Sequence, residues 1–161
     1  MIEKKEYISR RQELMSMMHK NSIAVISSAP EKVRSRDTNY PYKQNVNLTY
    51  LAGFPEPESV LVLIPDREDG QVILFCRDKD PLRETWDGYR EGPASAIKKY
   101  GLDDAFPISD IDDILPNLIE GKDRLYYAVG KDADFDKRIM EWVNHVKSQR
   151  GNGALPPGEF I

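Results

Sequence analysis

The sequence predicts an α/β domain in which a mixed β-sheet is flanked by α-helices. An amphipathic segment opens the chain, short aliphatic runs follow it, and from residue 81 onward helix-like segments alternate with strand-like ones. Such alternation is typical of a sheet with helices packed on it. The 161 residues, 40% of them hydrophobic, are enough to bury one continuous core.

The first half of the chain begins with a helix. Residues 3–19 place their apolar side chains on one side of a helical wheel, and the β-branched run at 22–28 predicts a buried strand. Three further strands are expected to form an antiparallel meander, with turns between them that contain glycine and proline. These strands are predicted at 48–52, 59–64 and 71–76.

The second half predicts helices at 82–86 and 93–100, and a short strand at 104–107. Ser109 followed by Asp112 is similar to a capping box and predicts the start of a helix that reaches Ile119.

A strand at 124–129 is expected before the last helix. The apolar face of that helix is predicted to consist of Phe135, Ile139, Trp142, Val143 and Val146. Residues 1–150 are therefore expected to form one domain. Residues 151–161, which are rich in glycine and proline, are expected to begin a linker.

Composition argues against several classes of partner. The formal net charge is −4, so the chain lacks the positive field that attracts nucleic acid. The charged opening does not fit a secretory signal, and the aliphatic run at 60–64 is far shorter than a membrane span of about 20 residues. We expect a cytoplasmic protein that binds neither nucleic acid nor membranes. The single cysteine, Cys76, is predicted to be a buried reduced thiol.

No complete catalytic set is present in the sequence. Its two histidines, His19 and His145, are far apart in the chain and do not indicate a metal pair. Three alternating aspartates at 132–136 begin like a calcium loop, but Lys137 stands where that loop needs glycine, so an acidic helix start explains them better. We expect no metal site within this chain.

Two polar features remain as candidates for recognition. Residues 31–47 form a long polar loop, and loops of this length in a compact domain are usually functional or disordered. Trp86 lies among charged residues and beside Gly88, where an exposed indole would suit a binding surface. An indole that only covers a helix end is the alternative.

The sequence RSRDTNYPYKQNVNLTYLAGFPEPESVLVLIP, at residues 34–65, strongly resembles the N-terminal domain of the aminopeptidase P family. The resemblance combines the R-x-x-D-x-x-Y-P-Y-x-Q-N loop with the G-F-x-E-P-E turn, and an I-x-R-R segment at 8–11 fits as well. It extends over essentially the whole chain.

The resemblance implies a mixed sheet flanked by helices, similar to the N-terminal domains of prolidase and creatinase and containing a ribonuclease H-like motif. It also implies a second, pita-bread domain that would follow residue 161 and bind two divalent metal ions, usually manganese. In such an enzyme a metal-activated hydroxide hydrolyses the N-terminal Xaa-Pro peptide bond. This chain would then be a noncatalytic domain that contributes to substrate access and to assembly of a homodimer or homotetramer.

Three residues match positions to which the family gives a role, and these are our candidate site residues. Asp37 matches a loop aspartate that joins a hydrogen-bond network at the active site, and Arg150 matches an arginine that precedes the linker. Trp86 matches an indole that reaches the active site of a neighbouring subunit in tetrameric members.

Two other functions stay open at this point. The same motifs occur in prolidase, which cleaves only Xaa-Pro dipeptides. A peptide-binding module that has lost catalysis is also possible, although the presence of Asp37, Trp86 and Arg150 argues modestly against it.

Overall fold

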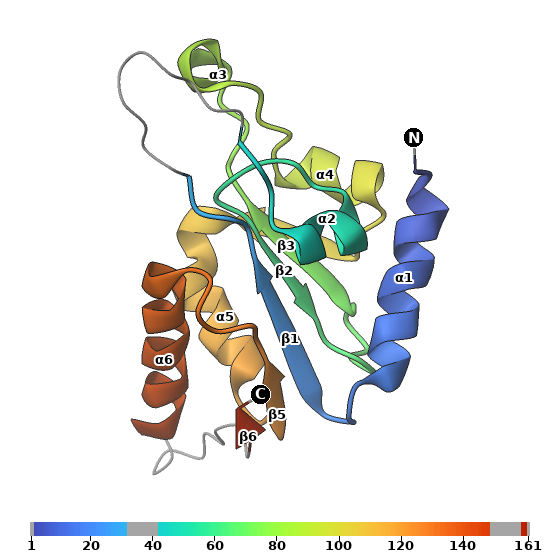
Figure 1. Ribbon diagram of the computed structural model, residues 1–161, viewed down its shortest axis with the longest axis vertical. Helices are drawn as coiled ribbons and strands as arrows, with labels where there is room; N and C mark the ends of the chain where they lie inside the picture. Colours follow the sequence, from blue (N-terminus) through green and yellow to red (C-terminus); the bar gives the residue numbers. More distant parts are fainter. Residues whose placement is uncertain (1, 32–41, 149–158, 161) are drawn as a thin grey trace.

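A six-stranded mixed sheet is the centre of the computed structural model, which describes residues 2–31, 42–148 and 159–160 (Figure 1). Its strands, in chain order, are β1 Ser22–Ser27, β2 Val60–Leu63, β3 Val72–Cys76, β4 Asp104–Pro107, β5 Arg124–Tyr126 and β6 Glu159–Phe160. The helices are α1 Lys4–Met17, α2 Val46–Ala52, α3 Pro81–Asp87, α4 Pro93–Tyr100, α5 Ile111–Ile119 and α6 Ala133–Ser148, with a 3-10 turn at Ile108–Asp110.

The sheet has an antiparallel centre and parallel edges. Its strand order is β4-β3-β2-β1-β5-β6, in which β2 pairs antiparallel with both β1 and β3. Strands β4, β5 and β6 each add in parallel. The predicted mixed sheet is thus confirmed, and the antiparallel meander exists, but β1 is its first strand.

The strand predicted at 48–52 is wrong, because this segment is helix α2. The Asn45 side chain caps the helix by accepting hydrogen bonds from the backbone N–H groups of Asn47 (2.8 Å) and Leu48 (3.4 Å). Gly53 ends it with a left-handed backbone (φ 66°), and a Cβ there would lie 2.6 Å from the Tyr7 ring. Five apolar or β-branched residues in a short run do not distinguish a strand from a buried helix, whereas the flanking Asn45 and Gly53 do.

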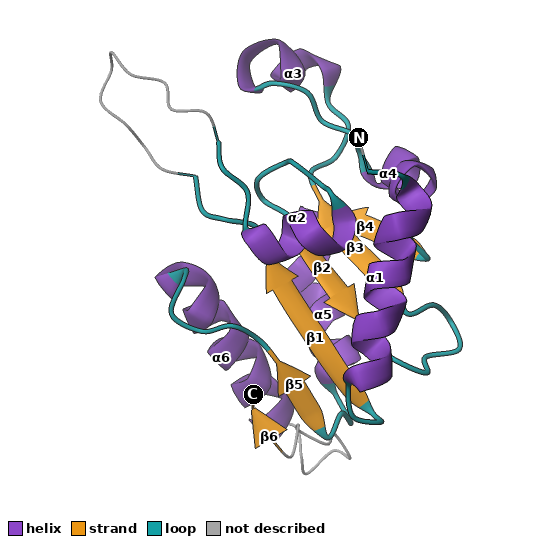
Figure 2. Ribbon diagram, turned by 45° about the vertical axis from the view of Figure 1, so that its right-hand side comes forward, coloured by secondary structure: helices purple, strands orange, loops and turns teal. Residues whose placement is uncertain are grey.

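Helices cover both faces of the sheet (Figure 2). On one face α1, α2 and α4 pack over a core that includes Met15, Leu48 and Ala96. On the other face α5 and α6 pack over a second core that includes Leu115 and Ile139. Alternate residues of the central strands face these two cores, as expected for a sheet buried on both sides.

The second half of the chain contains most of the elements that the sequence predicted. The five residues expected on the apolar face of α6 are its buried residues, and β4 has the predicted bounds. The capping box is wrong: Ser109 lies in a 3-10 turn, and Asp110, at the N-cap position, makes no side-chain cap. The Asp112 carboxylate instead accepts hydrogen bonds from Trp142 Nε1 (2.8 Å) and Arg138 Nη2 (3.2 Å), which joins α5 to α6.

Glu159–Phe160 lies in the segment expected to begin a linker, and it pairs with β5 as an edge strand. The division of the chain at residue 150 stays a prediction. Among the described residues, no helix has the length and apolar character needed to cross a lipid bilayer.

Candidate functional site

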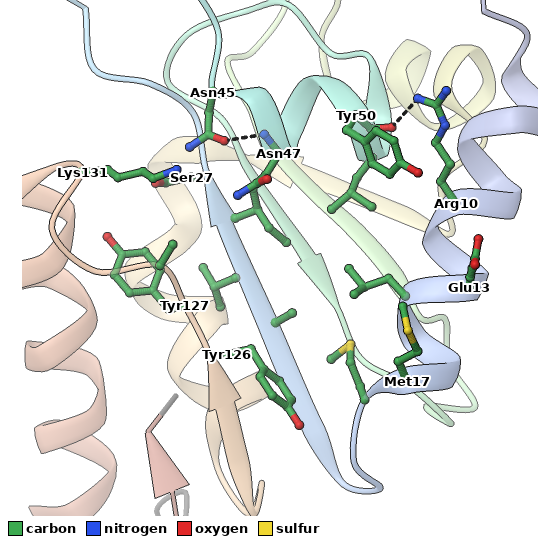
Figure 3. Close-up of a pocket in the computed structure, with 17 residues that line it drawn as sticks. Arg10, Glu13, Met17, Ser27, Asn45, Asn47, Tyr50, Tyr126, Tyr127 and Lys131 are labelled. Carbon is green, nitrogen blue, oxygen red and sulfur yellow. Dashed lines mark hydrogen bonds between the residues drawn. The ribbon is translucent and has the colours of Figure 1, made fainter.

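A pocket of about 560 Å³ lies on the sheet face beside α1 and α2 (Figure 3). Side chains of α1, β1 and β5, including Met17, Ile26 and Tyr126, form its apolar part. Polar groups on its rim include Asn45, Asn47 and Lys131. Among the described residues that line it, Glu13 is the one carboxylate and there is no histidine or cysteine. These residues suit contact with apolar or aromatic groups rather than acid-base chemistry.

Two arginines of the I-x-R-R segment hold the helices around this pocket. Arg11 is 1% exposed and donates hydrogen bonds to the carbonyl oxygens of Leu51 (2.9 Å), Tyr100 (3.1 Å) and Gly101 (2.8 Å), so it joins α1 to the ends of α2 and α4. Arg10 donates to the Tyr50 carbonyl at 3.0 Å, and its guanidinium lies 4.3 Å from the centre of the Tyr50 ring. The motif therefore has a structural role.

The described part of the Y-P-Y-x-Q-N motif connects the segment after β1 to the G-F-x-E-P-E turn. Gln44 Oε1 accepts a hydrogen bond from the Ala29 N–H (3.0 Å). The Tyr42 hydroxyl lies within hydrogen-bond distance of both Gln44 Oε1 (2.9 Å) and the Ala29 carbonyl oxygen, and its single proton is donated to one of them at a time. Gln44 Nε2 donates to the carbonyl oxygens of Phe54 (3.1 Å) and Glu56 (2.8 Å). Gln44 thus holds the end of β1 and the G-F-x-E-P-E turn against one another.

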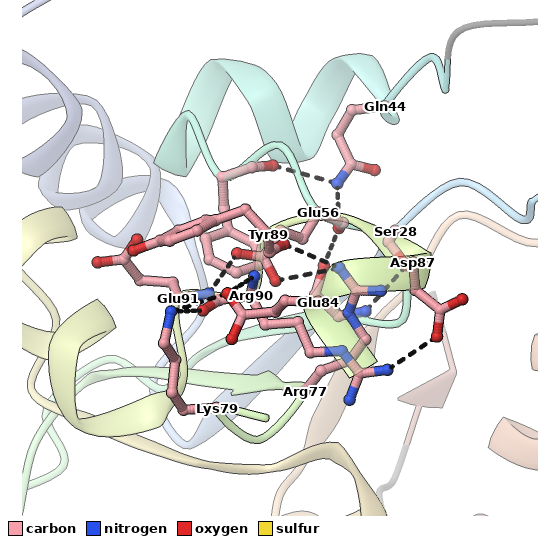
Figure 4. A network of polar contacts seen from close by, with 12 residues as sticks. Ser28, Gln44, Glu56, Arg77, Lys79, Glu84, Asp87, Tyr89, Arg90 and Glu91 are labelled. Carbon is pink, nitrogen blue, oxygen red and sulfur yellow. Dashed lines mark hydrogen bonds and ion pairs between the residues drawn. The ribbon is translucent and has the colours of Figure 1, made fainter. Parts of the chain in front are cut away.

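A buried ion pair lies next to this turn (Figure 4). The side chains of Glu56 and Arg77 are each 8% exposed, and Arg77 Nη2 lies 3.4 Å from Glu56 Oε1. Glu56 Oε2 accepts a hydrogen bond from the Glu91 N–H at 2.8 Å. The Glu91 carboxylate in turn accepts from the Ser95 hydroxyl and from Lys99 Nζ (3.4 Å) on α4.

Trp86 lies on α3, within an excursion at residues 78–91 that we call the α3 arm. Figure 1 shows α3 beyond the end of the sheet, away from the other helices. No α3 side chain is buried, and Trp86 is 83% exposed. The exposed indole expected from the sequence is therefore present, together with exposed Leu82 and Tyr89.

Of the three candidate residues, the structure describes only Trp86. Asp37 and Arg150 lie outside the described residues, so the roles of all three stay predictions. The G-F-x-E-P-E turn is recognisable in the sequence, but a role for Glu56, Arg77 or Glu91 was not predicted. The only available signal was an acidic residue next to aliphatic strands, where a charge needs a partner.

The described residues do not fit a metal centre, because they contain no cluster of three or more His, Cys, Asp or Glu side chains. Asp132 caps α6 by accepting from the N–H groups of Asp134 and Phe135 (both 3.1 Å), so an acidic helix start is confirmed. Cys76 is fully buried, and burial raises the pKa of its thiol to about 12, which disfavours the reactive thiolate.

Comparison with known proteins identifies the family. A family model described as "Aminopeptidase P, N-terminal domain" matches residues 7–126. The chain belongs to this family. Among curated relatives, Xaa-Pro aminopeptidase of Escherichia coli is 43% identical over 161 residues, which cover 99% of this chain and 36% of that protein. Human Xaa-Pro aminopeptidase 3 is 35% identical over 134 residues, 76% of this chain and 26% of that one.

Solved structures of aminopeptidase P also match the fold of this N-terminal domain. The structure of Pseudomonas aeruginosa aminopeptidase PepP matches with a TM-score of 0.95 and 55% identity, covering 99% of this chain and 36% of that one. A zinc-substituted E. coli aminopeptidase P in complex with product matches with a TM-score of 0.93 and 37% identity, covering 99% and 37%. The predicted family and fold are confirmed. The chain spans 24–36% of the length of the curated relatives that it matches.

Proposed function

We propose that this chain is the noncatalytic N-terminal domain of a peptidase that hydrolyses the N-terminal Xaa-Pro bond of peptides. One observation carries the proposal: proteins named Xaa-Pro aminopeptidase match nearly the whole chain, which spans only 36% of the E. coli relative. These names favour an aminopeptidase over a prolidase, and the catalytic groups would lie in the remaining part of such a protein.

The chain's contribution would be substrate access and subunit assembly. An exposed indole on an arm without buried side chains is available for contact outside its own domain, which suits the role expected for Trp86. Asp37 and Arg150 would join the hydrogen-bond network around the substrate. Assembly into a homodimer or homotetramer, and a cytoplasmic location, belong to the same proposal.

The enzyme's cofactor would be a pair of divalent metal ions, which we propose are manganese, bound outside this chain. Such ions supply an activated hydroxide for peptide hydrolysis. The residues of this chain would orient the peptide and would hold no metal themselves.

A chimera tests the proposal. This chain replaces the matching third of the E. coli enzyme, and hydrolysis of a Xaa-Pro peptide is measured beside the isolated chain and an isolated catalytic part. We expect turnover by the chimera and none by the isolated chain. A chimera that is folded and metal-loaded but inactive would contradict the proposal and favour a peptide-binding module without catalysis.

Substitutions in the active chimera test the three candidate residues. Asp37→Ala should lower kcat by roughly ten- to a thousand-fold with KM less affected, the scale of losing one acid-base contact. Arg150→Ala should weaken turnover, and Trp86→Ala should do so without changing metal content. Sedimentation of the same samples gives the oligomeric state. Unchanged turnover in any variant would remove that residue from the site.

A further inference from the structure

Glu56 contacts Gln44, which precedes α2, and both segments at the base of the α3 arm (Figure 4). Its backbone carbonyl accepts from Gln44, whereas its carboxylate accepts from the Glu91 N–H and pairs with Arg77. We infer that Glu56 is a positioning residue for the α3 arm. It fixes the orientation of the arm, and therefore of Trp86, relative to the turn that Gln44 holds. The consequence for turnover rests on the proposed function, but the anchoring itself does not.

The arm has no apolar core of its own to fix its orientation. No α3 side chain is buried, and the helix is only seven residues long. Such a short helix is marginal without tertiary contacts. Its direction therefore depends on the two chain segments at its base, which are residues 77–79 and 89–91.

Those two segments are held in two layers. In the outer layer Glu84 Oε1 accepts from Lys79 Nζ (2.8 Å) and from the Arg90 N–H (3.0 Å), and Lys79 also donates to the Arg90 carbonyl (2.9 Å). These contacts join the arm only to itself and to its own base. They close the arm but do not set its position on the domain.

The inner layer connects the arm to the rest of the domain. Glu56 comes from the turn before β2, Arg77 directly follows β3, and Glu91 lies two residues before α4. The Glu56 carboxylate joins the other two by accepting from the Glu91 N–H at 2.8 Å and pairing with Arg77 at 3.4 Å. Arg77 Nη2 also approaches the Tyr89 carbonyl at 3.4 Å, so the entrance and exit of the arm meet at one carboxylate.

A buried ion pair contributes little net stability, because the desolvation of the two charges offsets most of the attraction between them. Its benefit is geometric, since a carboxylate with two acceptor oxygens accepts from two directions at once. A neutral side chain of the same shape cannot satisfy both a guanidinium and a backbone N–H in this way. Glu56→Gln therefore separates the position of the arm from the packing of the core.

Hydrogen exchange on the 161-residue chain tests the anchoring directly. In Glu56→Gln, amides of residues 78–91 should exchange at least tenfold faster, while those of β3 change less than threefold. Glu58→Gln is the matched control, because Glu58 belongs to the same turn and is exposed. An unchanged arm would overturn the inference, as would an equal acceleration in β3, which would mean that Glu56 supports only global stability.

Arg77→Lys gives a second measurement if Glu56→Gln does not fold. Lysine keeps the positive charge but lacks the planar guanidinium that places Nη2 at 3.4 Å from both the Glu56 carboxylate and the Tyr89 carbonyl. We expect the same pattern, faster exchange in 78–91 with a protected β3. Exchange identical to that of the wild type would contradict the role of this pair as an anchor.

Kinetics in the active chimera test the consequence for catalysis. Glu56→Gln should lower kcat about tenfold with KM, metal content and folded fraction nearly unchanged, and Trp86→Ala in that background should add little because both changes act through one arm. A loosened arm with unchanged kcat would overturn the catalytic consequence. A chimera inactive without substitutions would contradict the proposed function instead, while the exchange measurement still decides the anchoring.

Discussion

Two regions of this molecule are stabilised by different kinds of interaction. Under α5 and α6, the sheet buries an apolar cluster that includes Leu115, Ile139 and Val143, each almost inaccessible to solvent. Under the α3 arm, the corresponding contacts are the buried ion pair of Glu56 and Arg77 and the hydrogen bonds of Gln44.

The difference shows how one domain can use one set of contacts to stabilise its fold and another to fix the position of an exposed arm. Apolar burial is strong but non-directional, so it suits a core that only has to remain closed. Hydrogen bonds and ion pairs contribute less net stability but fix direction, so they suit the base of an exposed arm. The following predictions test whether the two regions differ in this way.

Leu115→Ala should cause a large loss of stability. The side chain is fully buried in the α5–α6 core, and removing it should lower the free energy of unfolding by about 2–5 kcal/mol. Denaturant unfolding measures the loss, with Leu82→Ala as the control because Leu82 is 78% exposed. A loss below about 1 kcal/mol would show that this core does not dominate the stability of the domain.

Gln44→Ala should have an intermediate effect. The substitution leaves the Ala29 N–H and the Phe54 and Glu56 carbonyls without their amide partner, which should cost about 1–3 kcal/mol. Chemical denaturation of Gln44→Ala and of its exposed neighbour Lys43→Ala gives the comparison. Equal stability of the two variants would mean that water replaces the Gln44 contacts without cost.

Acid should weaken the base of the arm before it weakens the core. Burial alone would raise the pKa of Glu91, but hydrogen bonds from Ser95 and Tyr89 and the charge of Lys99 outweigh it and hold the pKa below the ordinary 4.5. A lowered folded pKa stabilises the fold fully above pH 4.5, and this contribution is lost as the pH falls through the lowered value. Melting curves of wild type and Glu91→Gln should therefore differ at pH 7 and converge as the pH falls through the lowered pKa of Glu91. A constant difference across this range would exclude ionisation of Glu91 as its cause.

Trp86→Ala should have the smallest effect on stability, within about 0.5 kcal/mol, because the indole is 83% exposed. Trp142→Ala is the matched contrast: Trp142 is 5% exposed and donates to Asp112, so its removal should cost about 3–5 kcal/mol. Thermal unfolding of the two variants measures both. Similar losses would show that Trp86 packs against the domain in solution.

Local patterns in the sequence predicted much of the fold. The five buried residues of α6, the bounds of β4 and the burial of Cys76 were all expected, because periodicity and chain punctuation act over a few residues. The error at 48–52 arose where a short apolar run fits both a strand and a helix, although Asn45 and Gly53 carried the correct signal. The error at Ser109 arose because Asp112 bonds to a helix 30 residues later in the chain.

The sequence by itself thus determined the α/β class, the family resemblance and the identity of the exposed Trp86, since each depends on residue types in local order. Only the tertiary structure decided that Gln44, Glu56, Arg77 and Glu91 meet at one point, because these residues come from four separate segments. A buried carboxylate has no local signature. The partners of the Glu56 carboxylate lie near it because β2 pairs with β3 and because the chain returns from the α3 arm into α4. Both are properties of the folded chain.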